Sequence, residues 1–287
     1  MVPYFTELAY GNPTMTHRPG WMAYETIQRV SEEVSRYIGA HTPEEVNFTP
    51  GETEANNLAI LGAALANRGR AIVVSEVEPL SIIFASKLLK RHGFEVRKVP
   101  VDGEGFVDLD ALSNLVDEQT VLVSISAVNH EIGTIQPLKE AVEAVRDRNP
   151  ETLFHTDMSD AYGRIPVDVS ELDVDLATFS SYKILGPRGV GVLYVREGVE
   201  VERLLEGQIG TQRLWPGVEN VPLIVGFLKA SELMFKDFEA NVEHMRRLRD
   251  RLMDGILNEI PDTLLNGPRE RRAPDNVNVS FRGCEGE

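Results

Sequence analysis

Short apolar segments alternate with amphipathic segments along most of this chain, and the alternation limits the folds open to it. The apolar segments have the length of buried strands, and the segments between them repeat apolar residues at helical spacing. Strands are expected at residues 71–75, 95–100, 120–126, 153–156, 176–180 and 190–195, and helices at 53–67, 81–92, 109–116, 138–147 and 221–235. This order predicts an α/β fold with a mostly parallel central sheet and helices on both faces.

The alternating pattern of apolar and amphipathic segments ends near residue 239. A long charged helix is expected at 239–259, and two short extended pieces follow it at 263–265 and 276–281. The predicted organisation is an N-terminal segment (1–11), a large domain (12–238) and part of a small C-terminal domain (239–287).

Composition excludes several classes of function. A net charge of −16 argues against direct binding to nucleic acid, which needs a basic surface. No apolar run reaches the roughly 18–20 residues that span a bilayer, and residues 1–10 lack the features of a signal peptide. We therefore expect a cytoplasmic protein without a membrane anchor. The single cysteine, Cys284, excludes a disulfide framework and a cysteine-based zinc site, and no other metal site is expected.

Polar residues follow three predicted elements, where ligands bind in a parallel sheet. The turn from Thr49 to Thr53, which includes Glu52, leads into a helix whose first amides attract anions such as phosphate. Alternatively, the turn is only the capped start of a helix, with Thr53 near the N-cap, and binds no ligand. Asp157 follows a strand, where it either caps a turn or pairs with the protonated ring nitrogen of pyridoxal phosphate (PLP).

The third element is a lysine between a strand and a glycine-rich loop. Ser180 ends the strand, and Tyr182 and Lys183 follow it. Partial burial is expected to lower the pKa of Lys183, which favours a Schiff base with an aldehyde. The Ser180 hydroxyl is able to donate to a phosphate.

Six motifs in a fixed order resemble those of the cysteine desulfurases, a family of PLP enzymes of fold type I. They are GNP with His17, FTPGETEANNLAI at 48–60, VNHEIGTIQP at 128–137, HTD at 155–157, SSYK with a glycine loop at 180–191, and NVNVSF with EGE at 276–287. The resemblance covers nearly the whole chain. It implies a homodimer that removes sulfur from L-cysteine and passes it to an iron–sulfur scaffold or a sulfur-carrier protein.

The resemblance also implies roles for individual residues. Lys183 carries the cofactor and moves the α-proton, and Asp157 holds the ring nitrogen. Thr53, Ser180 and Tyr182 hold the phosphate, at the turn that contains Glu52. His130 and Asp160 occupy the positions that contact the ring hydroxyl.

The chain departs from the family pattern at functional positions. Pro79 replaces a histidine that covers the ring, and Asp160 replaces a glutamine. His130 replaces an asparagine, Tyr182 a histidine, and Val218 a threonine that reaches the partner's phosphate. Each change alters a contact to PLP, so a non-catalytic member that acts by dimerisation or partner binding is an alternative. A related class V aminotransferase or a selenocysteine lyase is another.

The ends of the chain also differ from the family pattern. The family's opening strand is absent, and the nucleophilic cysteine belongs on a loop after the EGE segment. Cys284 is not that nucleophile on this alignment. We therefore expect a chain truncated at both ends that releases no sulfide from cysteine on its own.

Overall fold

The computed structural model describes residues 1–208 and 210–286; Ile209, and Glu287 at the end of the EGE motif, lie outside the described residues. The helices are α1 (Pro3–Thr6), α2 (Arg18–Ile38), α3 (Glu52–Asn57), α4 (Ala63–Ala66), α5 (Leu80–Arg91), α6 (Leu109–Leu115), α7 (Leu138–Arg148), α8 (Val221–Lys236) and α9 (Phe238–Glu259). The short helical turns are η1 (Pro43–Glu45), η2 (Leu58–Gly62) and η3 (Tyr182–Ile184). The strands are β1 (Val46–Thr49), β2 (Ala71–Ser75), β3 (Glu95–Val99), β4 (Thr120–Ser124), β5 (Leu153–Asp157), β6 (Leu176–Ser180), β7 (Gly191–Val195), β8 (Thr263–Leu265) and β9 (Val279–Phe281).

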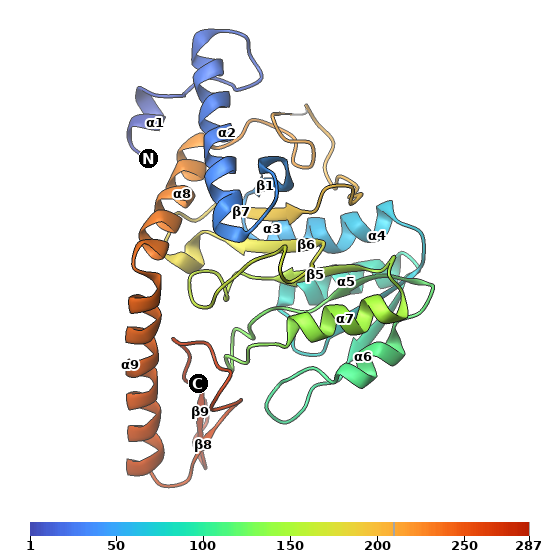
Figure 1. Cartoon of the computed structure of the whole chain (residues 1–287), viewed down its shortest axis with the longest axis vertical. Coiled ribbons are helices and arrows are strands. Elements are labelled where there is room, and N and C mark those ends of the chain that lie inside the picture. Colours follow the sequence, from blue (N-terminus) through green and yellow to red (C-terminus); the bar gives the residue numbers. More distant parts are fainter. Residues whose placement is uncertain (209, 287) are drawn as a thin grey trace.

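Within the described residues, seven strands form one sheet in the order β1-β7-β6-β5-β4-β2-β3. Figure 1 labels the first four strands of this order, β1, β7, β6 and β5. The neighbouring pairs from β6 to β3 are parallel, and β7 pairs antiparallel with both β1 and β6. Strands β2, β4 and β6 are buried along their whole length, as expected for a parallel sheet covered on both faces. The predicted α/β fold with a mostly parallel sheet is confirmed.

Helices cover the two faces of the sheet and form two separate cores. Along β7, Val192 and Tyr194 pack into one core and Leu193 into the other, because successive side chains of a strand point to opposite faces. Helices α2, α7 and α8 supply apolar side chains to the first core. Helices α3 and α5 supply the second.

Helix α2 was not expected from the sequence. The ring of His17 accepts a hydrogen bond from the Gly20 N–H at 3.1 Å and caps the start of the helix. Ile27 and Val34 lie on its buried face, and Gly39, with φ of 73°, ends it. The helix lies beside α8 in Figure 1.

After α8 the chain continues almost directly into α9, which extends away from the sheet (Figure 1). Strands β8 and β9 then form a separate antiparallel pair. The amides of Asn276 and Asn278 each donate to the Glu131 carbonyl at 3.0 Å, which fixes this segment to the loop after β4. The boundary near residue 239 stays a prediction. No helix in the described ranges has the length and apolar character needed to cross a membrane.

Gly191 permits close packing between the turn after β1 and the end of β6. It pairs with Thr49 on one side and with Ser180 on the other. A Cβ atom at this position would lie 2.9 Å from the Gly51 carbonyl carbon and 2.9 Å from the Phe179 oxygen, and both neighbours are backbone atoms.

We therefore expect Gly191→Ala to lower the free energy of unfolding by about 1–3 kcal/mol, as overpacking does elsewhere. Urea denaturation measures the change, with Gly103→Ala as the control because a Cβ at Gly103 meets nothing within 4 Å. Equal stability of the two variants would contradict this account of the packing.

Candidate functional site

The topology brings the predicted site segments to one edge of the sheet. Thr49, Asp157 and Ser180 each end a strand, and the reversed strand β7 begins beside two of them at Gly191. Because β1, β7, β6 and β5 are consecutive neighbours, the turn after β1 and the end of β5 lie along a single edge. This is the edge at which parallel sheets bind ligands.

Asp157 is buried at this edge. Its carboxylate accepts hydrogen bonds from the Asn56 amide at 2.7 Å and from the Ser159 N–H at 2.8 Å. Burial raises the pKa of the Asp157 carboxyl, and these hydrogen bonds oppose the rise. Among residues 1–208 and 210–286, no lysine or arginine forms an ion pair with it. The site therefore holds a buried carboxylate without a cation.

Asn56 is a site residue that the sequence reasoning missed. It is fully buried, and its amide nitrogen also donates to the Ser81 hydroxyl at 2.9 Å. It lies four residues after Glu52, so both side chains project from the same face of the helix. This four-residue spacing from Glu52 could have identified Asn56 as a site residue from the sequence alone.

Lys183 lies on η3, directly beyond β6. Its Nζ atom is 3.0 Å from each carboxylate oxygen of Asp160. Burial lowers the pKa of the Lys183 amine, but the charge and hydrogen bonds of Asp160 raise it more, with a smaller rise from Glu52, and the net pKa lies above its ordinary value. The prediction of a lowered pKa was wrong, because it considered burial without the partner that the fold supplies.

The predicted phosphate residues lie in different environments. Ser180 is fully buried, and its hydroxyl has no hydrogen-bond partner within the described chain. Thr53 is exposed at the start of α3. Tyr182 is 46% exposed, and the Lys183 Nζ atom lies 5.6 Å from the centre of its ring.

Glu52 is the first residue of α3 and is only partly exposed. Its Oε2 atom is buried and has no hydrogen-bond partner in the described part of the protein. Burial raises the pKa of Glu52 to about 7, and the charge of Asp157 adds to the rise, whereas Lys183 opposes it. The start of this helix therefore carries a carboxyl group that is easily protonated near neutral pH.

His130 lies on the turn after β4. Its Nε2 atom is 3.7 Å from a carboxylate oxygen of Glu131, and its side chain is 37% exposed. In the described chain, no hydrogen bond or ion pair joins it to Asp157 or Lys183.

Glu78 is a second residue that the sequence reasoning missed. It is buried, and its carboxylate accepts hydrogen bonds from the Ser126 N–H at 3.0 Å and the Ser126 hydroxyl at 2.5 Å. Burial raises the pKa of Glu78 to about 7, against the effect of these hydrogen bonds. It stands just before Pro79, at the start of α5.

The raised pKa of Glu78 makes stability depend on pH. Between its unfolded value of 4.5 and about 7 the folded state binds more protons, so the free energy of unfolding falls as pH rises through this window. This group accounts for about 3 kcal/mol of the fall. Glu78→Gln is expected to flatten that part of the pH–stability curve, whereas the control Glu76→Gln leaves it unchanged. An unaltered curve in Glu78→Gln would exclude Glu78 as the source.

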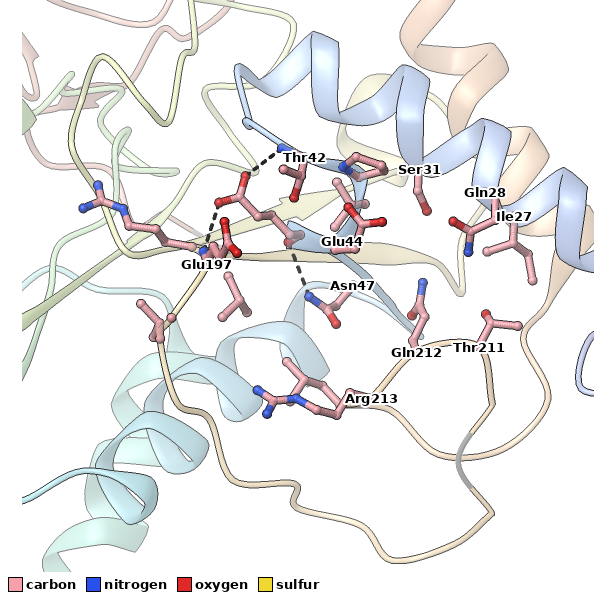
Figure 2. Close-up of a pocket in the computed structure, with 18 of the residues that line it drawn as sticks. Ile27, Gln28, Ser31, Thr42, Glu44, Asn47, Glu197, Thr211, Gln212 and Arg213 are labelled. Atoms are coloured by element: carbon pink, nitrogen blue, oxygen red, sulfur yellow. Dashed lines mark hydrogen bonds between the residues drawn. The ribbon is translucent and has the colours of Figure 1, made fainter.

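A cavity of about 610 Å³ lies away from this edge, between α2, η1, β1 and the segment after β7 (Figure 2). None of its lining residues is a predicted site residue. The Glu45 carboxylate beside it accepts hydrogen bonds from the backbone N–H groups of His41, Thr42 and Glu197, so it serves to hold loops together. We therefore assign the candidate site to the edge with Lys183.

The resemblance implies PLP, and three observations at this edge fit that group. The cation-free Asp157 suits a protonated pyridine nitrogen. The partnerless hydroxyl of Ser180, beside the start of α3, suits a phosphate oxygen. Lys183 supplies the amine, although its ion pair with Asp160 must open first.

Comparison with known proteins agrees with PLP as the cofactor. The family model described as aminotransferase class-V matches residues 1–287. The chain is 43% identical over 289 residues to cysteine desulfurase IscS 1 of Archaeoglobus fulgidus, covering 100% of this chain and 74% of that protein. It is 40% identical over 292 residues to cysteine desulfurase IscS of Rickettsia felis, covering 100% of this chain and 70% of that protein.

A solved structure titled NifS-like protein has the same fold. It superposes with a TM-score of 0.93 at 37% identity, over 98% of this chain and 76% of that one. The chain therefore belongs to the aminotransferase class-V family, whose members depend on PLP.

Proposed function

We propose that this chain is a PLP-dependent enzyme of the cysteine desulfurase type, which removes sulfur from L-cysteine. The observation that carries the proposal is the buried carboxylate of Asp157, which has no cationic partner among the residues that the structure describes and lies at the edge that also holds Lys183. The names of its relatives support cysteine as the substrate. PLP supplies an electron sink that stabilises negative charge at the α-carbon of the substrate.

Asp157 is the residue proposed to hold a proton on the ring nitrogen. Its hydrogen bonds from Asn56 and Ser159 fix the carboxylate in place, and burial strengthens its attraction to a cation. Ser180, Thr53 and Tyr182 are proposed to bind the phosphate together with the backbone at Glu52. His130 is proposed to approach the ring hydroxyl.

Lys183 is proposed to anchor the cofactor and to carry the α-proton on Nζ. A proton acceptor must be neutral, so the ammonium of Lys183 has to give up its proton before it acts. Asp160 lies 3.0 Å from Nζ and holds that proton in place. We assign Asp160 the role of setting when Lys183 becomes available.

The proposal includes partners and location. We propose that two copies pair and that the sulfur passes to an iron–sulfur scaffold or a sulfur-carrier protein in the cytoplasm. Trp21 and Tyr24 are exposed on α2 in an edge-to-face pair, which is typical of side chains that become buried on association. Light scattering of the purified chain should give the mass of a dimer.

A non-catalytic protein of the same family is the second candidate. The ion pair between Lys183 and Asp160 favours it, because that pair holds the amine as an ammonium ion. This candidate predicts a protein that stays colourless with PLP.

The two candidates are separated by spectroscopy. We expect the wild-type chain mixed with PLP to retain a visible absorbance band after gel filtration, and Lys183→Ala to lose it. Lys236→Ala is the control, because Lys236 lies at the end of α8. Addition of L-cysteine should change the retained absorbance band without forming a keto acid. Formation of one keto acid per bound cofactor would instead indicate an aminotransferase. A colourless wild-type protein at every pH tested would rule out the proposed enzyme.

A further inference from the structure

Glu52 has a position that its assignment to the phosphate turn does not explain. It lies four residues before Asn56, whose amide reaches the Asp157 carboxylate at 2.7 Å. Residues at this spacing share a helix face, so the Glu52 side chain faces the edge that holds Asp157. Its Oε2 atom is buried and has no hydrogen-bond partner in the described residues.

The charged groups around Glu52 come from three neighbouring segments. Asp157 ends β5, Asp160 follows it, and Lys183 lies on η3; the Ser159 hydroxyl is the remaining polar neighbour. Lys183 is already 3.0 Å from both oxygens of Asp160. Glu52 therefore lies near two other carboxyl groups and one ammonium group, and that ammonium group is already paired with Asp160.

A phosphate group at the start of α3 adds negative charge to this set. The unpaired amides of a helix start attract an anion, but Glu52 is the first residue of the same helix and stands beside that position. Two anions this close repel each other strongly at low solvent exposure. The repulsion ends if Glu52 gains a proton.

We propose that Glu52 is a proton-dependent gate for the phosphate of the ligand, so that a pyridoxal-type phosphate binds as the Glu52 carboxyl group takes up one proton. The inference rests on the proposed cofactor site. It assigns to the Glu52 side chain control over ligand entry, whereas the resemblance places Glu52 only within the turn that holds the phosphate.

The electrostatics of the site support this gate. Burial raises the pKa of Glu52 to about 7, and Asp157 and Asp160 raise it against the opposing effect of Lys183 and Ser159. The free-energy cost of protonating Glu52 is therefore small at neutral pH and increases as the pH rises further. By linkage, affinity falls by up to tenfold for each pH unit above this value.

Pyridoxine 5′-phosphate is a suitable probe because it has the phosphate but no aldehyde, so Lys183 cannot react with it. Calorimetry at pH 6.5 and pH 8.5, in two buffers of different ionisation enthalpy, counts the protons taken up. At pH 8.5 we expect the wild-type chain to take up close to one proton per ligand. We expect its affinity to be at least about tenfold weaker than at pH 6.5.

Glu52→Gln and Glu52→Ala should both take up about one proton fewer per ligand than the wild type, and their affinity should change much less between the two pH values. Glu54→Gln is the matched control, because a residue two positions along a helix does not share its face; it should behave like the wild type. Proton uptake in both Glu52 variants that equals that of the wild type, or its absence from the wild type, would overturn the gate while leaving the proposed function standing. Failure of all variants to bind the probe, and of the wild type to bind PLP, would overturn both.

Discussion

Asp157→Asn is expected to weaken PLP binding by about a hundredfold to a few thousandfold. Removing one partner of a buried ion pair typically costs about 3–5 kcal/mol, because the remaining charge has no counterpart. Here the remaining charge is the protonated ring nitrogen, which has no alternative anion held as firmly as the carboxylate that Asn56 and Ser159 fix. Equilibrium dialysis with PLP measures the loss.

The same substitution should not lower the stability of the cofactor-free protein. Asparagine removes a buried carboxylate that has no cation within the described ranges, and its side chain still accepts a hydrogen bond. Asp147→Asn on α7 is the control for a generic loss of charge. A fall in PLP affinity smaller than about fivefold, or an equal fall in the control, would contradict the role of Asp157.

The sequence predicted the strands at the site well because their apolar runs are short and bounded by turn residues. The predicted strand at 153–156 is β5, which extends one residue further to Asp157, and the strand at 176–180 is β6. Parallel strands bring their carboxyl ends to one edge, so this placement followed from strand order alone. The edge that contains Ser180 and Asp157 was therefore predictable without a structure.

Other features depend on tertiary contacts that no local pattern reveals. The reversed direction of β7 is set by its pairing with β1 and β6, which lie far apart in the sequence. Helix α2 was missed although its apolar spacing from Ile27 to Val34 is regular. The helix expected at 53–67 forms, but η2 interrupts it with a π-type turn.

The charge state of Lys183 could not be predicted from the local sequence. Its position directly after a strand and before a glycine loop was predicted, but the short helical turn η3 that carries it was not. Its nearest anion, Asp160, is 23 residues away along the chain, and only the packing of β5 against β6 brings the two together. A prediction from burial alone therefore had the wrong sign.

Asp160→Gln is expected to free Lys183 for the cofactor. Without the carboxylate, burial again lowers the pKa of the amine, and only Glu52 and Tyr182 still raise it, so more Lys183 is neutral at a given pH. Glutamine keeps a polar side chain at the position and is the residue that the resemblance places there. The pH at which the visible band of bound PLP develops should move downward.

A second measurement reports on the amine without PLP. Acetic anhydride modifies neutral amines, and mass spectrometry of the cofactor-free protein at pH 7.5 gives the rate at Lys183. We expect this rate to rise by about tenfold or more in Asp160→Gln, because a charge partner within hydrogen-bond distance shifts the pKa of an amine by a unit or more. In the control variant Asp160→Glu, which retains the charge, Lys183 should react as in the wild type. Lys229 is an internal control, because it pairs with Glu232 at 2.7 Å on α8 and should react at the same rate in every variant. An unchanged rate at Lys183 in Asp160→Gln would show that Asp160 does not hold its proton, and the availability of this amine would then have to be set by Glu52 alone.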